Sequence, residues 1–181
     1  MIGFHLFEKI HNKQNIGSTR IRGRWVLKYW PEAEEFVQGR KYDAVIFQKT
    51  YLPEYTALYD GIKILDICDP DWFEWQNVMD MVVNCDAITV SSPQLQETTK
   101  QWTDKPVVYI PDRIDLETIK QTKKHEGQAR KVIWFGYSHN QKVLDGILYS
   151  LEKRNLELTV ISDAPLPDID HWIKWDIETV N

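Results

Sequence analysis

Three aspartates crowd the segment LDICDPDW (65–72), which contains the end of an aliphatic run. Carboxylates in such a place can accept hydrogen bonds from sugar hydroxyls, bind a cation or act as a general base. We therefore take Asp66 and Asp69 as candidate catalytic residues. A structural role such as helix capping explains these two acids equally well, and it suits Asp71 better than chemistry does.

Glycine, hydroxyl and guanidinium groups gather in GSTRIRGR (17–24), after the first predicted strand. Gly17, Ser18, Arg20 and Arg24 are candidate substrate-binding residues. The two arginines would lie about one turn apart on a helix, where they could face one anion together. A solvated basic helix face is the competing explanation.

Two further strand ends carry polar side chains. Gln48 and Lys49 follow one aliphatic run, and Ser91 and Ser92 follow another. We add all four to the candidate substrate-binding residues. An ordinary exposed pair is the alternative for Gln48 and Lys49, and a helix N-cap is the favoured alternative for Ser92.

The segment WFGYSHN (134–140) places a glycine and small polar residues between a strand and a helix. Backbone N–H groups at a helix start attract anions, and glycine lets a phosphate approach closely. Gly136, Ser138 and His139 are therefore candidate donor-phosphate ligands. On local sequence alone a plain turn is favoured, because a lone glycine is weak evidence.

These groups need a parallel sheet to bring them together. Short aliphatic runs without polar alternation suit strands that are buried on both faces, and helical spacers between them suit parallel crossovers. The fold class is therefore α/β, with ligands expected at the carboxyl ends of the strands. The predicted strands of the first part are 2–7, 43–48, 63–67, 87–91 and 107–110.

The spacers predict helices with recognisable ends. A helix over 20–29 should stop at Trp30, because the residue before proline avoids the helical region. Pro31 then favours a short helical turn in PEAEEFVQ. Residues 71–85 form an amphipathic helical pattern, and Ser92 should cap a helix that follows it.

The polar, charged stretch 117–130 predicts a linker between two domains, 1–116 and 131–181. The second holds one β-α-β unit, which leaves bare sheet edges and too little apolar area for a domain. We therefore expect a chain that stops within its second domain. The uncovered sheet face should be apolar, which predicts a homodimer through it.

Composition excludes several classes of function. A net charge of −5 argues against nucleic acid as the main partner. Two cysteines make no disulfide framework, and no cysteine or histidine spacing suggests a metal. The N-terminus lacks the features of a signal peptide, and no apolar stretch approaches the ~20 residues that span a bilayer. We expect a cytoplasmic protein without a transmembrane segment.

Taken in order, GSTRIR, KYDAVIFQK, ILDICDPDW, DAITVSSPQL, VVYIPDRID and VIWFGYSHN resemble the family 4-type glycosyltransferases of the GT-B fold. IPDRID (110–115) is similar to the Ile-Pro-Asn-Gly-Ile-Asp segment at which those enzymes pass from their N-terminal to their C-terminal domain. The resemblance covers about 2–163. Cys68, Asp112 and Arg113 depart from the family pattern, so the turn at 112–113 must differ in detail.

The resemblance implies two Rossmann-like domains, an acceptor-side domain and the start of a donor-side domain. It implies transfer of a sugar from a nucleotide-sugar donor to a saccharide or similar acceptor, with no metal or other cofactor. Gly17, Ser18 and Arg20 would line the cleft, and Asp66 and Asp69 would face the acceptor or the transferred sugar. Because the family's donor-binding glutamates lie beyond 181, we expect little or no transfer activity from this chain.

Two other hypotheses stay open. The first is a noncatalytic saccharide- or phosphate-binding module that keeps the fold without the reaction. The second is a single flavodoxin-like domain with an extra β-α-β unit, which would bind another phosphate ligand and would pack 117–130 against the domain.

Overall fold

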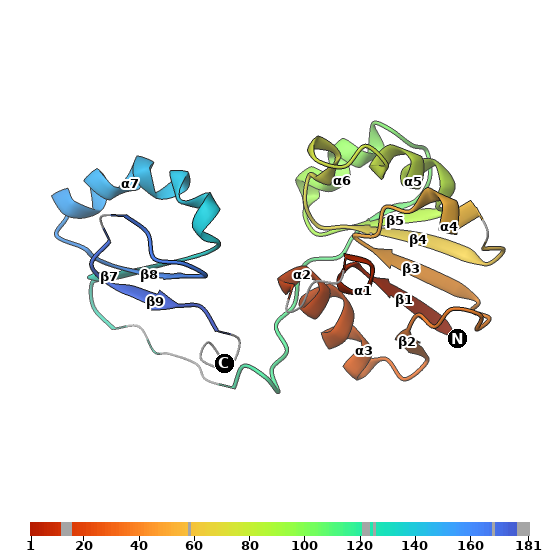
Figure 1. Cartoon of the computed structure of the whole chain (residues 1–181), viewed down its shortest axis with the longest axis horizontal. Coiled ribbons are helices and arrows are strands. Elements are labelled where there is room, and N and C mark those ends of the chain that lie inside the picture. The colour runs from red at the N-terminus through yellow and green to blue at the C-terminus, as the bar shows by residue number, and fades with distance from the viewer. Residues whose placement is uncertain (12–15, 58, 121–123, 125, 168, 177–181) are drawn as a thin grey trace. The chain divides into compact units, whose positions relative to one another are not determined.

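The α/β class is confirmed by the computed structural model of the chain, which describes residues 1–11, 16–57, 59–120, 124, 126–167 and 169–176. The chain divides into two compact units, Met1–Leu116 and Glu117–Asn181. Each unit has a parallel sheet of its own (Figure 1). The predicted 117–130 linker includes 121–123 and 125, which lie outside the described residues, and it stays a prediction.

The first unit is built on a six-stranded sheet in the order β2-β1-β3-β4-β5-β6, with every neighbouring pair parallel. This order is compatible with a Rossmann-like, doubly wound sheet. The predicted strands are present, and each differs from its prediction by one residue at one end. The strands are β1 Ile2–Leu6, β2 Ala33–Glu35, β3 Ala44–Gln48, β4 Ile62–Ile67, β5 Ala87–Val90 and β6 Val107–Tyr109.

Helices cover both faces of this sheet. Figure 1 shows α4, α5 and α6 on one face and α2 and α3 on the other. Right-handed crossovers produce this division, because the chain first steps from β1 to one side and later runs from β3 to the other. The helical segments are α1 Phe7–His11, α2 Gly17–Thr19, the π-helical turn η1 Arg20–Arg24, α3 Trp25–Tyr29, α4 Pro53–Ala57, the 3-10 turn η2 Asp71–Phe73, α5 Val78–Asn84 and α6 Pro93–Lys100.

The main core lies between the sheet and α4–α6. Side chains that alternate along the central strands point into it, among them Phe47, Leu65 and Ile88, which occupy neighbouring register positions. Leu65 and Ile88 have no exposed surface. Burial of such aliphatic side chains contributes about 1.5–3 kcal/mol each, so the core is what fixes the register of the strands.

One predicted helical turn is wrong. Ala33–Glu35, within PEAEEFVQ, forms the edge strand β2 and pairs with β1 at Ile2 and Phe4. Alanine and glutamate favour helices by intrinsic propensity, but tertiary pairing overrides so weak a preference. The predicted helix over 71–85 is also divided, since η2 and α5 leave 74–77 outside both.

The second unit has a three-stranded parallel sheet in the order β7-β8-β9. Leu144 of its long helix packs against Val160 and Leu166 to form a small core. The elements are β7 Lys131–Phe135, the 3-10 turn η3 Ser138–Asn140, α7 Lys142–Lys153, β8 Glu157–Ser162 and β9 Trp172–Lys174.

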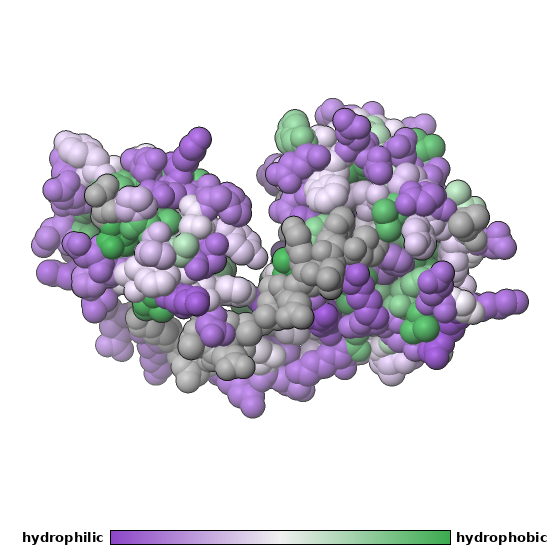
Figure 2. Space-filling view, in the orientation of Figure 1, coloured by the Kyte–Doolittle hydropathy of each residue, from purple (hydrophilic) through white to green (hydrophobic). Residues whose placement is uncertain are grey.

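The face of the molecule in Figure 2 is mostly hydrophilic, with hydrophobic residues in small separate groups. Within the described ranges, no helix has both the length and the apolar character that a membrane crossing requires.

Candidate functional site

The strand order places a topological switch point between β1 and β3. The chain leaves these two neighbouring strands toward opposite faces of the sheet (Figure 1). In open α/β sheets this arrangement leaves a crevice at the carboxyl ends of the strands. Ligands of open α/β sheets bind outside that edge. Lys49, which follows β3, and the segment 68–71, which follows β4, both lie there.

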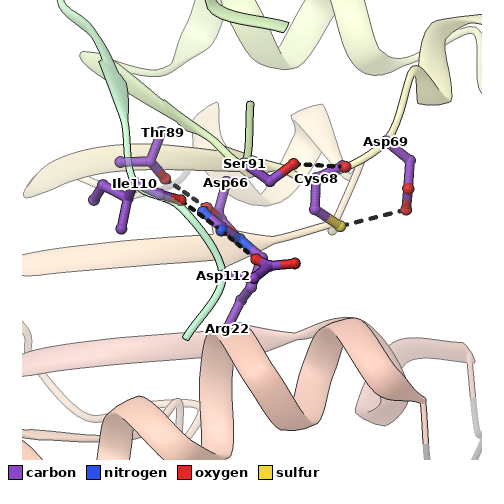
Figure 3. Close-up of polar contacts among 8 residues, drawn as sticks. All are labelled: Arg22, Asp66, Cys68, Asp69, Thr89, Ser91, Ile110 and Asp112. Atoms are coloured by element: carbon purple, nitrogen blue, oxygen red, sulfur yellow. Dashed lines mark hydrogen bonds and ion pairs between the residues drawn. The ribbon is translucent and has the colours of Figure 1, made fainter. Parts of the chain in front are cut away.

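Beneath this edge, Arg22 and Asp66 form a buried ion pair (Figure 3). Arg22 Nε donates to Asp66 Oδ2 at 2.8 Å, and Nη2 donates to Oδ1 at 2.6 Å. Thr89 Oγ1 donates to the same Oδ1 at 2.6 Å. Such paired, bidentate hydrogen bonds are the condition under which two buried charges are stable.

The remaining donor of Arg22 reaches the chain beyond β6. Nη1 donates to Ile110 O and to Asp112 Oδ1, both at 2.8 Å. Three segments far apart in sequence, η1, β4 and 110–112, therefore meet at one guanidinium (Figure 3). Burial acts to lower the pKa of Arg22, but hydrogen bonds to Asp66 and Asp112 outweigh it and raise the pKa, so Arg22 stays charged.

A second set of hydrogen bonds, to Asp115, holds the segment that follows β6. Asp115 is buried, and it accepts hydrogen bonds from Lys28 Nζ at 2.9 Å and from Tyr29 Oη at 2.5 Å. The IPDRID segment is thus held against η1 and α3 by two of its acids, Asp112 and Asp115. Because its acids bind side chains of the same unit, we assign this segment a structural role: it holds η1 and α3 at the edge of the sheet.

The accessible chemistry lies at Lys49 and Asp69. Lys49 Nζ is 2.7 Å from Asp69 Oδ2 and 3.2 Å from Asp71 Oδ1. The Asp69 side chain keeps 56% of its surface exposed, whereas that of Lys49 keeps only 15%. Lys49 has a backbone φ of 50°, a left-handed conformation that is uncommon outside glycine and asparagine and often marks functional sites.

Electrostatics keep this lysine cationic. Burial acts to lower the pKa of Lys49, but the hydrogen bond to Asp69 and nearby acidic groups raise it overall. Asp71 is buried, which raises the pKa of its carboxyl group although Tyr51 Oη donates to it. The arrangement therefore presents one exposed carboxylate, Asp69, that is oriented by a charged lysine.

Asp66 differs from Asp69 in what it can contact. Both of its oxygens accept hydrogen bonds from protein groups, and the residue is 4% exposed. A carboxylate in that position holds its neighbours in place. Of the two predicted catalytic residues, only Asp69 has an oxygen open to a substrate.

The predicted arginine pair does not face one anion. Arg24 binds Glu8 at 2.8 Å and Glu35 at 3.5 Å, whereas the guanidinium of Arg20 lies 5.7 Å from the ring centre of Trp25. The π-helical turn is the reason, since Trp25 N–H donates to Arg20 O, five residues back. Such a turn shifts the phase of a helix, so the two arginines are not stacked one turn apart.

The polar residues at the other strand ends bind mainly the protein itself. Gln48 is fully buried and accepts a hydrogen bond from Thr19 Oγ1 at 3.1 Å. Ser91 Oγ donates to Cys68 O at 2.8 Å. Ser92 is the N-cap of α6, where its Oγ accepts from Leu95 N–H at 3.2 Å.

Gly17 and Ser18 form the first turn of α2, and both are half-buried. No part of the described chain lies within 4 Å of a Cβ placed on Gly17, so packing does not require glycine there. Gly23, by contrast, is tightly packed, because a Cβ there would lie 2.5 Å from Leu6 Cδ2 and would force the Leu6 side chain to move. This close approach lets η1 lie directly on β1 and sets the reach of Arg22.

The predicted phosphate ligands belong to the second unit. Ser138 N–H donates to Asp163 Oδ1 at 2.6 Å, so a carboxylate of the chain already uses that donor. His139 stacks on Tyr137 with ring centres 5.5 Å apart. Gly136 makes room for Trp134, whose ring would lie 2.9 Å from an added Cβ.

Sequence reasoning missed Arg22 and Thr89. Thr89 could have been found, because it stands opposite Asp66 in the register of β5 on β4. Arg22 could not be separated from Arg20 and Arg24 without knowing the helix phase. Across the described part of the chain, no group of three or more His, Cys, Asp or Glu side chains could hold a metal ion.

The thiol of Cys68 should be unreactive although it lies beside the exposed Asp69. Its Sγ donates to Asp69 Oδ2 at 3.4 Å, and burial together with the negative charge of Asp69 raises the pKa of the thiol. A thiol alkylates through its thiolate, so iodoacetamide at pH 8.5 should modify Cys68 at least about tenfold more slowly in the folded chain than in urea. Peptide mass spectrometry measures this, and equal rates in both states would contradict the arrangement.

Comparison of the chain with protein-family models, with curated proteins and with solved structures finds no match.

Proposed function

We propose that the chain is a glycosyltransferase-like protein of the GT-B type. It would hold a nucleotide-sugar donor and a saccharide or similar acceptor, and pass a sugar from one to the other, at the carboxyl edge of the six-stranded sheet. The observation that carries this proposal is the ion pair of Lys49 and Asp69 beside the switch point. The Asp69 carboxylate is exposed, and the Lys49 side chain is mostly buried.

The two side chains suit the reaction in complementary ways. Asp69 has an exposed carboxylate that accepts hydrogen bonds, so it would bind a sugar hydroxyl or take the proton of the attacking acceptor. Lys49 is a cation that would hold the Asp69 carboxylate in place, since the two groups are 2.7 Å apart. Asp66 would act as a positioning residue, since Arg22 and Thr89 occupy its oxygens. The ordered resemblance of 2–163 to the family supports the same proposal.

A noncatalytic saccharide- or phosphate-binding module is the second candidate. Two positions at which an active enzyme would need open groups are occupied by the chain itself: the carboxylate of Asp66 and the N–H of Ser138. A site in which only one carboxylate stays accessible fits binding as well as it fits transfer.

We also propose that the protein is cytoplasmic and that nucleic acid is not its partner. Both cysteines are free thiols, as is usual in the reducing cytoplasm. The net charge of −5 gives no basis for nucleic-acid binding.

Calorimetric titration of the chain with UDP, GDP and their sugar conjugates tests the proposal. We expect saturable binding of one nucleotide sugar, with little or no turnover when an acceptor is added. Saccharide binding without binding of any nucleotide sugar would instead establish the noncatalytic module. A folded chain that binds neither ligand contradicts both.

Asp69→Asn should remove whatever low transfer activity the chain retains and should preserve the fold. The amide keeps the shape of the side chain but cannot take a proton, and loss of such a group lowers turnover by about 10²–10⁴-fold. Asp80→Asn, at an exposed position on α5, is the matched control and should leave turnover unchanged. Transfer rates for the three chains decide the matter, and full activity of Asp69→Asn would remove Asp69 from the mechanism.

We also propose a homodimer through the uncovered face of the second sheet. Phe135, Ile161 and Ile173 stand in one register row across its three strands, on the face opposite the core residue Val160. Ile133 and Phe135 are 66% and 67% exposed. Parallel sheets are normally covered on both faces, and an apolar surface of this kind favours a partner.

Ile133→Thr combined with Phe135→Thr should convert the dimer to a monomer. Threonine keeps the preference for a strand and removes the apolar surface. Val143→Thr, at an exposed valine of α7, is the control and should remain dimeric. Sedimentation velocity over a range of concentrations measures the species. A wild-type chain that is monomeric throughout, or a double variant that still dimerises, would refute this interface.

A further inference from the structure

A separate cavity lies at the carboxyl end of β1, on the face of the sheet that α4 covers. Its volume is about 330 Å³, at the lower end of the ~300–1,000 Å³ that is typical of small-molecule sites. His5, Phe36 and Tyr55 contribute aromatic rings to its wall, and Lys9 and Gln38 are its long polar side chains. We call it the His5 cavity. Lys49 and Asp69 are not part of its lining.

The aromatic rings of this cavity form one contiguous group around the imidazole. The ring centre of His5 lies 4.9 Å from that of Phe36, 5.6 Å from that of Phe47 and 6.0 Å from that of Tyr55. Tyr55 is 45% exposed, so one face of the group is open to a ligand. Aromatic surfaces of this kind bind other flat rings by offset or edge-to-face stacking.

The imidazole is neutral and offers an unused nitrogen. Burial, assisted by the positive charge of Lys9, lowers the pKa of His5 to about 4. Its Nδ1 is buried and has no hydrogen-bond partner among the residues that the structure describes. A buried polar atom without a partner is unfavourable, so a ligand that pairs with Nδ1 would recover stability.

The charges at the cavity cancel. Lys9 Nζ lies 2.9 Å from Glu35 Oε2, which leaves no unpaired cation among the described residues of the cavity wall. A cationic ligand would meet Lys9 without a buried carboxylate in the cavity wall to balance it. The site therefore suits an uncharged molecule.

We propose that the His5 cavity binds a neutral, planar heteroaromatic ring, of which adenine is the simplest probe. The ring would stack on Tyr55 and Phe36, and a turn of the His5 ring would bring Nδ1, which is buried, to one of its nitrogens. A sugar fits less well, because each of its hydroxyl groups needs a polar partner and the wall is mostly apolar and aromatic. This site goes beyond the proposed sugar transfer, and it does not depend on Asp69.

Titration of the full chain with adenine at pH 7, and separately with glucose, tests the inference. We expect saturable binding of adenine and much weaker binding of glucose. Tyr55→Ala should weaken adenine binding by about five- to 100-fold, the range measured when a stacking aromatic is truncated. Tyr149→Ala removes a more exposed tyrosine from α7, outside the cavity, and should change nothing.

The role of the unpaired nitrogen needs its own variant. His5→Phe keeps an aromatic ring and removes Nδ1, so it should weaken adenine binding while the circular dichroism of the chain stays unchanged. Should that variant fail to fold, comparison of Tyr55→Ala with Tyr149→Ala still tests whether adenine binds in the His5 cavity.

Three results would overturn the inference: no adenine binding by the folded chain, glucose binding as tight as adenine binding, or equal affinities for Tyr55→Ala and wild type. Loss of adenine binding together with retained binding of a nucleotide sugar would count against this site alone and would leave the proposed function standing.

Discussion

A guanidinium and a carboxylate that are both hidden from water stabilise a fold only when their hydrogen bonds are complete. Arg22 and Asp66 meet this condition, with Thr89 and the backbone of Ile110 as further partners. The pair joins the helical layer after β1 to the end of β4 and to the chain that leaves β6. The positions of the strand ends around it, and hence of the residues that follow them, depend on this contact.

The same contact decides where chemistry is available. Because Arg22 binds Asp66, the carboxylate that faces outward is Asp69, and Lys49 orients it from the neighbouring strand end. A backbone hydrogen bond links the buried pair to the exposed one, since Lys49 N–H donates to Asp66 O at 3.0 Å. Asp66 and Asp69 thus lie three residues apart at the end of β4. Asp66 is buried and structural, whereas Asp69 is exposed and accessible to a ligand.

The sequence predicted the central strands well because their aliphatic runs match strands that are covered on both faces. It failed at β2, where AEE reads as helical and pairing with Ile2 and Phe4 decides otherwise. It located the strand-end acids but could not assign their partners. The wide turn at 20–24 shifts the helix phase, and side chains that pair across 44 residues leave no local pattern. Ser92, for which a cap was the favoured alternative, is indeed a cap.

A double-mutant cycle on Arg22→Met and Asp66→Asn, read by urea unfolding, tests most directly whether this pair holds the sheet edge. Removing one partner of a buried pair costs about 3–5 kcal/mol, because the other charge is left without compensation. We predict that the double variant is more stable than the sum of the single effects by about 1–3 kcal/mol. Effects that add to within about 0.5 kcal/mol would show that the two residues act independently, and would contradict the account.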